Sequence, residues 1–203
     1  MPVFRINGKN ILFIHVPKTG GTTVETFLEA QCEMSLHSRG GRLLKPSKGS
    51  ALTRSLPLQH FHAEILESMF ALGFFDYAFM VVRDPLERLK SEYRHSLALR
   101  QPDTLLNFGH WVHLMLGLSK FAPNLRNNHF RPQSQFRCFN AEVFKLEDGL
   151  EDLFRALSSR LGIVQPETIP HERRLNDVPL NVTPRIKALV RSAFDADYRM
   201  FSY

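Results

Sequence analysis

The stretch HVPKTGGTTV, residues 15–24, constrains this chain most, because it follows the apolar run Ile11–Ile14. An apolar strand that ends in a lysine, two glycines and three threonines is typical of a phosphate-binding loop. Glycines let the backbone wrap closely around an oxyanion, and a helix starting near Thr22 directs its free N–H groups at the same point. The stretch therefore predicts a phosphate site on Lys18, Thr19, Gly20, Gly21, Thr22 and Thr23.

The order of residues differs from that of the loop of nucleoside triphosphatases. In that loop the lysine follows the last glycine, and the next Ser or Thr binds magnesium. Here Lys18 precedes both glycines, so the loop suits a terminal phosphate better than a chelated triphosphate. The alternative interpretation is a tight strand-to-helix turn that binds nothing.

Short apolar runs alternate with helical patterns along the 203 residues, which predicts βαβ units. We expect one domain over residues 1–203, an α/β fold of three layers, similar to P-loop proteins, with a mainly parallel central sheet flanked by helices. An opening hairpin is expected around Asn7 and Gly8. Further strands are predicted at 78–82 and 143–146, and helices at 22–31, 63–72, 85–97, 103–116, 150–161 and from 183 onward.

Two details of these helices are specific enough to test. Asp103 is predicted to cap the helix that runs to Leu116. In the helix that begins at Pro85, the apolar stripe leaves Arg88 on another side, away from the buried face.

The formal net charge is +6 and the isoelectric point is near 9.6, with the excess concentrated in two stretches. Residues 34–63 hold five Lys or Arg and residues 104–141 hold four, and neither stretch has an acidic residue. Clustered positive charge attracts polyanions, although two solvated loops are the alternative. Residues 35–59 have the composition of a long loop, which is usually functional or disordered.

Cys32 and Cys138 lie far apart, and their spacing suits no metal site, so we interpret them as free thiols. Free thiols favour a reducing, cytoplasmic setting. The sequence shows neither a signal peptide nor an apolar stretch long enough to cross a bilayer, so no transmembrane segment is expected.

A second cluster, RDPLERLKSEYR, begins at Arg83 directly after the predicted strand 78–82. Open α/β sheets bind ligands at the carboxyl ends of their strands. Arg83 and Ser91 are therefore candidates for a second phosphate, the arginine through its fork of donors. In the alternative interpretation Arg83 pairs with Asp84 or Glu87.

Together the two clusters resemble the sulfotransferase family. PKTGGTT resembles the loop that holds the 5′-phosphosulfate of 3′-phosphoadenylyl sulfate (PAPS), and RDPLERLKSEYR resembles the 3′-phosphate motif. VFKLED and the terminal ADYRMFSY resemble the carbohydrate branch that includes heparan sulfate 2-O-sulfotransferase. The resemblance implies PAPS as donor and no metal. It places the 5′-phosphosulfate on residues 18–23 and the 3′-phosphate on Arg83 and Ser91.

The resemblance also implies roles for residues outside the two clusters. The family closes a late loop over the adenosine, for which Arg173 and Arg174 are candidates; an exposed basic turn is the alternative. NNHFRPQSQF, residues 127–136, resembles a stretch near the acceptor, where His129, Arg131 and Gln133 are candidate substrate contacts. The alternative interpretation of Gln133 is structural, in which its side chain ties down the proline-bent loop. The eukaryotic relatives carry a membrane anchor, and none is evident here, which favours a soluble, bacterial-type member.

The reaction requires a group that takes the proton of the attacking hydroxyl, and histidine suits that task near neutral pH. QHFHAEILE places His60 and His62 just before a predicted helix, and a His-x-His segment carries the catalytic histidine in the resembling branch. His62 is the first candidate and His60, beside the acceptor, the second; a core or capping histidine is the alternative. Lys18 is expected to stabilise the charge on the bridging oxygen.

We therefore predict a PAPS-dependent enzyme that sulfonates a hydroxyl, on a carbohydrate or another, possibly anionic, acceptor. A small-molecule kinase of P-loop type is one alternative, disfavoured by the residue order and the lack of a clear magnesium carboxylate. A non-catalytic polyanion-binding protein is the other, although no nucleic-acid module supports it. The acceptor and the oligomeric state stay open.

Overall fold

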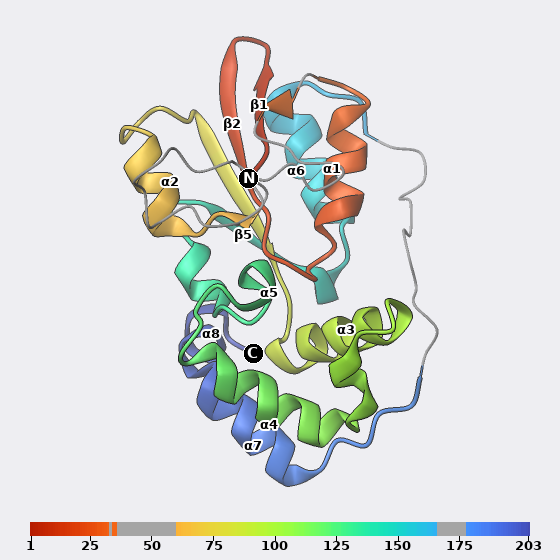
Figure 1. Cartoon of the computed structure of the whole chain (residues 1–203). Coiled ribbons are helices and arrows are strands. Elements are labelled where there is room, and N and C mark those ends of the chain that lie inside the picture. Colours follow the sequence, from red (N-terminus) through yellow and green to blue (C-terminus); the bar gives the residue numbers. More distant parts are fainter. Residues whose placement is uncertain (33, 36–59, 166–177) are drawn as a thin grey trace.

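A five-stranded sheet in the order β3-β1-β2-β4-β5 forms the centre of the molecule (Figure 1). This computed structural model describes residues 1–32, 34–35, 60–165 and 178–203. The pairings β2–β4 and β4–β5 are parallel, whereas β1 runs antiparallel to both β2 and β3. The strands are β1 (Val3–Ile6), β2 (Lys9–Ile14), β3 (Met34–Ser35), β4 (Tyr77–Val82) and β5 (Glu142–Lys145).

The sequence-based expectation of a parallel sheet is confirmed for β2, β4 and β5, and the other edge is antiparallel. That edge contains the expected hairpin, in which Val3 lies opposite Leu12 and Ile6 opposite Lys9. Its turn needs two residues with positive φ, and Asn7 (50°) and Gly8 (78°) supply them.

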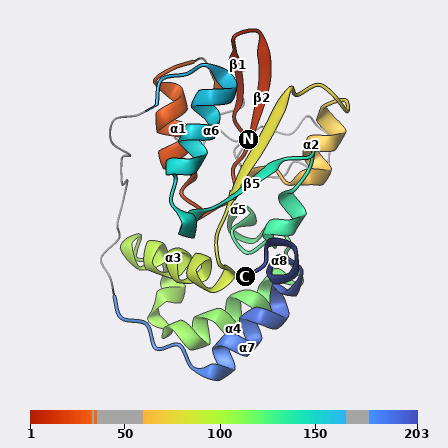
Figure 2. The same ribbon diagram turned by 180° about the vertical axis from the view of Figure 1, so that it is seen from behind.

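Helices cover both faces of the sheet because successive side chains of a strand point to opposite sides. Ile11, Phe13, Phe79 and Val81 pack beneath helices α1 and α6, which lie together on one side in Figures 1 and 2. Leu12, Ile14, Met80 and Val82 pack on the other side, against α2, η4 and the end of α8. The helices are α1 (Gly21–Glu29), α2 (Ala63–Met69), α3 (Pro85–Ala98), α4 (Phe108–Ser119), α5 (Leu125–Asn128), α6 (Glu151–Leu161), α7 (Pro184–Ala193) and α8 (Asp195–Phe201), with the short helices η3 (Pro102–Leu105), η4 (Gln133–Phe136) and η5 (Leu146–Asp148).

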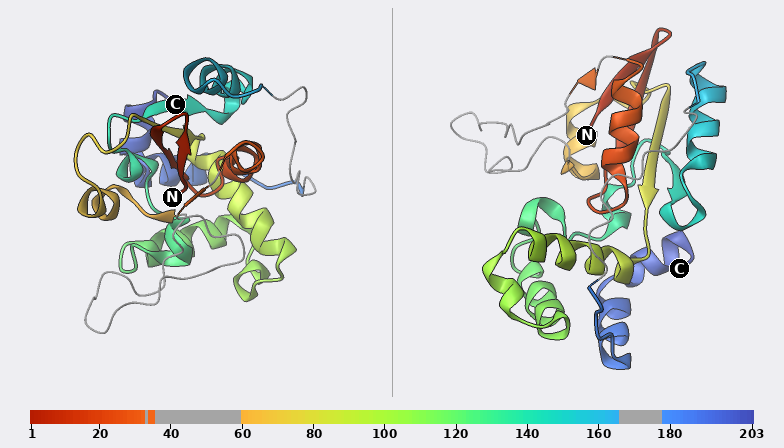
Figure 3. Two further views of the ribbon diagram at one scale, coloured as in Figure 1. Left: turned by 90° about the horizontal axis from the view of Figure 1, so that it is seen from above. Right: turned by 90° about the vertical axis from the view of Figure 1, so that its right-hand side faces the viewer.

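A third apolar cluster, separate from the two faces of the sheet, joins α3, α4 and α7 beyond the carboxyl end of β4 (Figure 3). Trp111 is fully buried there, next to Tyr93, Phe108 and Phe130. This helical layer holds α3 in place, and α3 carries the second predicted phosphate motif.

Two details of the expected helices were wrong. Asn107 caps α4, because its side chain accepts a hydrogen bond from the His110 N–H at 3.1 Å. Asp103 instead accepts hydrogen bonds from the Trp111 indole and the Arg126 guanidinium. Arg88 was expected away from the buried face of α3, but it is only 2% exposed. The expected starts at Pro85 and Pro184 and the end at Gly162 (φ 67°) are confirmed.

A buried clamp joins β4, η4 and α8. The Gln133 side chain accepts a hydrogen bond from the Arg83 N–H at 2.9 Å and donates one to the Arg83 carbonyl at 2.7 Å. The Asp197 carboxylate accepts hydrogen bonds from the N–H groups of Gln133 and Ser134, both at 2.8 Å. Gln133 and Asp197 are both 0% exposed. The clamp therefore fixes the backbone at the exact residue where β4 leads into the second motif.

Removing the Asp197 carboxylate should destabilise the fold strongly. In Asp197→Ala two buried N–H groups lose their acceptor, so we expect the free energy of unfolding to fall by about 3 kcal/mol. The matched control is Asp195→Ala, because Asp195 is exposed and, among the residues that the structure describes, pairs with Arg199 on the same helix. The control substitution should lower the free energy of unfolding by less than about 1 kcal/mol. Urea unfolding of both variants measures the difference, and equal losses would contradict the clamp.

Candidate active site

The phosphate loop, residues 17–23, connects β2 to α1 through backbone that only some residues adopt easily. Gly20 caps α1 with φ 81°, and Lys18 has φ 69°. A side chain at Gly20 would also meet Leu146 at 3.0 Å. Thr19 is buried, and its hydroxyl donates to the Val16 carbonyl at 2.9 Å, so it shapes the loop. Thr22 is exposed at the first turn of α1, where helix N–H groups lack partners within the helix.

His15, which was not among the residues predicted from the sequence, packs against this loop. His15 is 6% exposed, and its Nδ1 lies 2.5 Å from the Glu25 carboxylate of α1. Its ring presses against Gly21: a Cβ at that position would lie 2.4 Å from His15 Nε2. Gly21 is therefore needed for packing against His15 as well as for any approach of a ligand. The signal in the sequence that indicates this role is the position of His15, between β2 and the phosphate loop.

Arg83 presents a positive charge at the carboxyl end of β4. Gln133 holds its backbone, while its half-buried guanidinium makes no hydrogen bond or ion pair with any residue in the described ranges. The alternative pairing with Asp84 or Glu87 is not seen. Asp84 instead accepts a hydrogen bond from the Glu87 N–H, and the Glu87 side chain pairs with Lys90. Ser91 lies half-buried further along the same helix.

Arg88 connects the phosphate loop to the segment around residue 130. Its Nε donates to the Pro17 carbonyl at 3.1 Å, and its Nη2 donates to the carbonyls of His129 and Arg131 at 2.7 and 2.8 Å. Burial lowers the pKa of Arg88 to about 10, partly offset by the negative charges of Asp197 and Glu92. The side chain is thus still cationic at neutral pH, and one buried cation joins three backbone segments.

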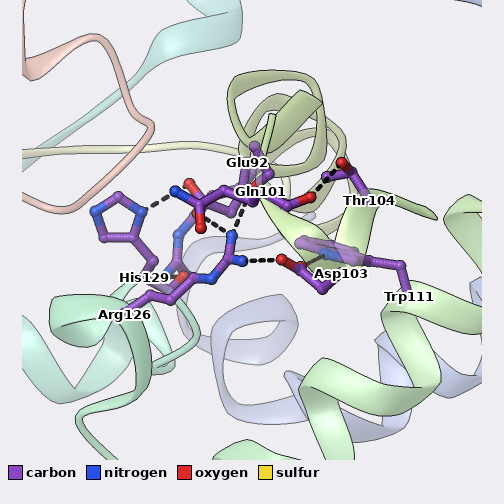
Figure 4. A network of polar contacts seen from close by, with 9 residues as sticks. Glu92, Gln101, Asp103, Thr104, Trp111, Arg126 and His129 are labelled. Carbon is purple, nitrogen blue, oxygen red and sulfur yellow. Dashed lines mark hydrogen bonds and ion pairs between the residues drawn. The ribbon is translucent and has the colours of Figure 1, made fainter. Parts of the chain in front are cut away.

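Three histidine rings lie in a row beside the loop. The ring centroids of His15 and His60 are 5.2 Å apart, and those of His60 and His129 are 5.1 Å apart. His60 Nδ1 donates to the Asn127 carbonyl at 3.1 Å, and His129 Nδ1 donates to the Glu92 carboxylate at 2.7 Å. Figure 4 shows the polar network that continues from His129 and Glu92 through Arg126 to Asp103.

His62 adjoins this row through Asn128. The Asn128 amide nitrogen donates to the His60 carbonyl at 2.8 Å and lies 3.4 Å from His62 Nδ1. His62 Nε2 lies 3.6 Å from the carboxylate of Glu64, whose side chain is exposed. We call His15, His60, His62 and His129 the histidine cluster.

Burial and nearby positive charge favour the neutral form of two of these rings. Burial, followed by the charges of His15 and His129, lowers the pKa of His60 well below its ordinary value. Burial, followed by the charge of Arg131, lowers the pKa of His62. Burial alone would raise the pKa of Glu92, but the hydrogen bond from His129 and nearby cations, Lys18 among them, lower it overall. The cluster thus combines neutral imidazoles with an ionised carboxylate, a pairing suited to proton transfer.

A sequence model of the sulfotransferase family matches residues 2–203, which is nearly the whole chain. The chain belongs to the sulfotransferase family. Neither a curated protein nor a solved structure matches it significantly. Family membership makes it a transferase of sulfuryl groups.

The fold of this sulfotransferase brings the two predicted phosphate motifs and the histidine cluster together at the carboxyl ends of β2 and β4. Two of the predicted substrate contacts make hydrogen bonds within the protein. Gln133 is 0% exposed and bound to Arg83, which supports its structural interpretation. The Arg131 guanidinium binds Asn128, Gln135 and Asn124 side chains. Arg173, Arg174 and nearly all of the basic segment 35–59 lie outside the described residues.

Within the described ranges, no group of three or more His, Cys, Asp and Glu side chains is placed to hold a metal ion. None of the helices in the described part of the chain is long and apolar enough to cross a membrane.

The contact between His15 and Gly21 makes the loop sensitive to a single methyl group. In Gly21→Ala the new Cβ overlaps a ring that Glu25 holds in place, so we expect a loss of about 1 to 3 kcal/mol in unfolding free energy. Gly117→Ala is the matched control, since a Cβ there meets nothing within 4 Å. Because alanine favours helices over glycine, the control should be stabilised by about 0.5 to 1 kcal/mol. Adding His15→Ala to Gly21→Ala should recover part of the loss, and purely additive effects would contradict the contact.

Proposed function

We propose that this sulfotransferase transfers the sulfuryl group of PAPS to a hydroxyl group of a carbohydrate, with a histidine as general base. The observation that carries the proposal is the convergence of three features on one edge of the sheet: the glycine loop before α1, the Arg83 guanidinium and the histidine cluster. The helices on both faces of the sheet fit a P-loop-like, three-layer domain over residues 1–203.

The protein groups on the donor side match the charges of PAPS, which we treat as the second substrate. Residues 18–23 supply a lysine, a glycine bend and helix N–H groups for the 5′-phosphosulfate. Arg83 and Ser91 are assigned to the 3′-phosphate, and Arg173 and Arg174 to the adenosine end. The Arg83 guanidinium fits this role because it makes no polar contact within the described part of the chain.

The protein contributes positioning, charge and a proton acceptor. Lys18 stabilises the negative charge that develops on the bridging oxygen when the sulfuryl group leaves. A histidine accepts the proton of the attacking hydroxyl, and the sequence favours His62 and then His60. His129 and Arg131 border the acceptor side. Positioning and electrostatics supply most of the rate in such a site.

The acceptor and the compartment follow from charge and cysteine chemistry. The basic stretches favour an acidic acceptor, such as an anionic glycan. Cys32 and Cys138 are both free thiols, which supports work in a reducing, cytoplasmic compartment.

Donor recognition can be tested without turnover. Adenosine 3′,5′-bisphosphate should raise the Tm far more than AMP, because only the former offers a 3′-phosphate to Arg83 and Ser91. Arg83→Ala should erase the difference, a loss of about 2 to 3 kcal/mol in binding. Arg5→Ala, which removes an exposed arginine from β1, should keep it. Thermal shift assays measure all of these, and equal shifts from both nucleotides in the wild-type protein would refute the assignment.

Metal dependence separates sulfuryl transfer from phosphoryl transfer. Lys18 precedes both glycines, whereas the lysine of magnesium-binding phosphate loops follows the last glycine, so transfer from labelled PAPS should survive saturating EDTA. ATP in place of PAPS should give no labelled product. A strict magnesium requirement, together with activity on ATP, would favour the kinase alternative.

A further inference from the structure

We propose that His129 is the general base of this enzyme and that Glu92 is the residue that positions it. This inference rests on the proposed function and names the proton acceptor that the function requires. It replaces the sequence-based choice of His62, because a general base must turn an unprotonated nitrogen toward the substrate, and the hydrogen bonds around each ring determine which nitrogen that is.

His62 has its proton on the unsuitable nitrogen. The Asn128 side chain has only one possible orientation, since its oxygen accepts from Arg131 Nε at 2.9 Å and its nitrogen donates to the His60 carbonyl at 2.8 Å. The remaining hydrogen of that nitrogen therefore points at His62 Nδ1. A neutral His62 then carries its own proton on Nε2, beside Glu64, and its lone pair faces Asn128. In this arrangement His62 has no lone pair directed at an acceptor hydroxyl.

His60 has the suitable tautomer in an enclosed position. Its Nδ1–H donates to a backbone carbonyl, which leaves Nε2 as the acceptor nitrogen. However, the ring is sandwiched between those of His15 and His129, and the residue is only 6% exposed. At this position His60 packs against the ring of His129 and is too enclosed to contact a large acceptor directly.

His129 combines the suitable tautomer, a carboxylate partner and access. Its Nδ1–H donates to Glu92 at 2.7 Å, so Nε2 carries the lone pair. Its side chain is 16% exposed, against 8% for that of His62. Glu92 is itself only 4% exposed and is held by Arg126 at 3.5 Å. A buried carboxylate on Nδ1 both fixes the ring and stabilises the imidazolium that forms when Nε2 takes a proton.

The same contacts place His129 beside the donor loop. The Arg88 guanidinium binds the Pro17 carbonyl and the His129 carbonyl at once, so the backbone before Lys18 and the backbone of His129 flank one side chain. The charge of Lys18 also acts on Glu92. The expected base and the expected electrophilic lysine therefore lie on neighbouring segments, as a transfer between two substrates requires.

The proposed step conserves atoms and charge. Nε2 of neutral His129 takes the proton from the acceptor hydroxyl while that oxygen forms its bond to sulfur. The bond between sulfur and the 5′-phosphate oxygen breaks, and its electron pair stays on that oxygen beside Lys18. The imidazolium, held by Glu92, returns its proton to solvent after the products leave.

The first test reads the tautomers directly and needs no activity. Long-range ¹H–¹⁵N NMR of the histidine-labelled protein distinguishes a protonated Nδ1 from a protonated Nε2. We expect neutral His129 to be protonated on Nδ1 and neutral His62 on Nε2, with single substitutions assigning the signals. The opposite pattern would overturn the inference whatever the kinetics show.

The second test compares matched variants in sulfuryl transfer from PAPS. His129→Asn should lower kcat by about 10²- to 10⁴-fold, the usual contribution of a positioned base. The KM for PAPS and the Tm shift caused by adenosine 3′,5′-bisphosphate should not change. His62→Asn should lower kcat less than tenfold. His113→Asn, an exposed histidine of α4, should match the wild-type protein.

The third test isolates the role of Glu92 through the pH profile. The base works when neutral, so activity falls as the pH drops through its pKa. Glu92→Gln removes the charge that favours the imidazolium, and the acid limb of the pH profile should move to lower pH. Glu92→Asp, which keeps the negative charge, should bring the acid limb part of the way back to its wild-type position. The charged and titratable groups around this pair, which the variants leave in place, are Lys18, His60, Arg88, His95 and Arg126.

The outcomes separate this inference from the function on which it rests. A wild-type protein that neither binds adenosine 3′,5′-bisphosphate nor transfers sulfuryl groups would overturn both. Normal transfer with a large kcat loss in His62→Asn and a mild one in His129→Asn would overturn the inference alone. An unmoved pH limb in Glu92→Gln, in a variant that keeps the nucleotide-induced Tm shift, would remove Glu92 from its positioning role.

Discussion

The buried guanidinium of Arg88 is the contact on which the arrangement of the site depends. It rises from α3, reaches the carbonyl that precedes Lys18, and holds two carbonyls of the segment around His129. A buried cation is costly unless its donors are satisfied and opposite charges lie near, and Asp197 and Glu92 supply those charges. The phosphate loop and the histidine cluster are therefore parts of one polar core.

The arrangement of the site also depends on a strained backbone segment, residues 126–128. Arg126, Asn127 and Asn128 all have positive φ, at 47°, 58° and 69°. Such residues cost about 1 to 3 kcal/mol each and persist only where surrounding contacts hold them. Here each residue has a contact of that kind: Arg126 binds Asp103, Asn127 accepts from His60, and Asn128 binds the His60 carbonyl. The strained turn thus orients the histidines and is held by them.

The elements of the fold were largely predictable, because local rules govern them. Alternating apolar runs gave β2 and β4, Asn7-Gly8 gave the hairpin, and Thr183-Pro184 gave the start of α7. The errors came where a polar side chain had a distant partner. Asp103 had the composition of a helix cap, yet Trp111 and Arg126 take its oxygens. From the sequence Arg88 was expected to be a surface residue, because nothing in its own helix indicates that its guanidinium binds three distant backbone carbonyls.

The sequence by itself determined the phosphate loop that we propose for the donor, since one continuous stretch supplies the strand, the glycine bend, the lysine and the start of the helix. Its chemistry is local and needs no long-range contact to be recognised. Only the tertiary structure decided which histidine we propose as the proton acceptor. Histidines occur near residues 15, 60 and 129, and which of them presents a lone pair depends on partners such as Glu92 and Asn128 that lie far away in the sequence. A tautomer is set by a hydrogen bond, and that hydrogen bond exists only after the chain has folded.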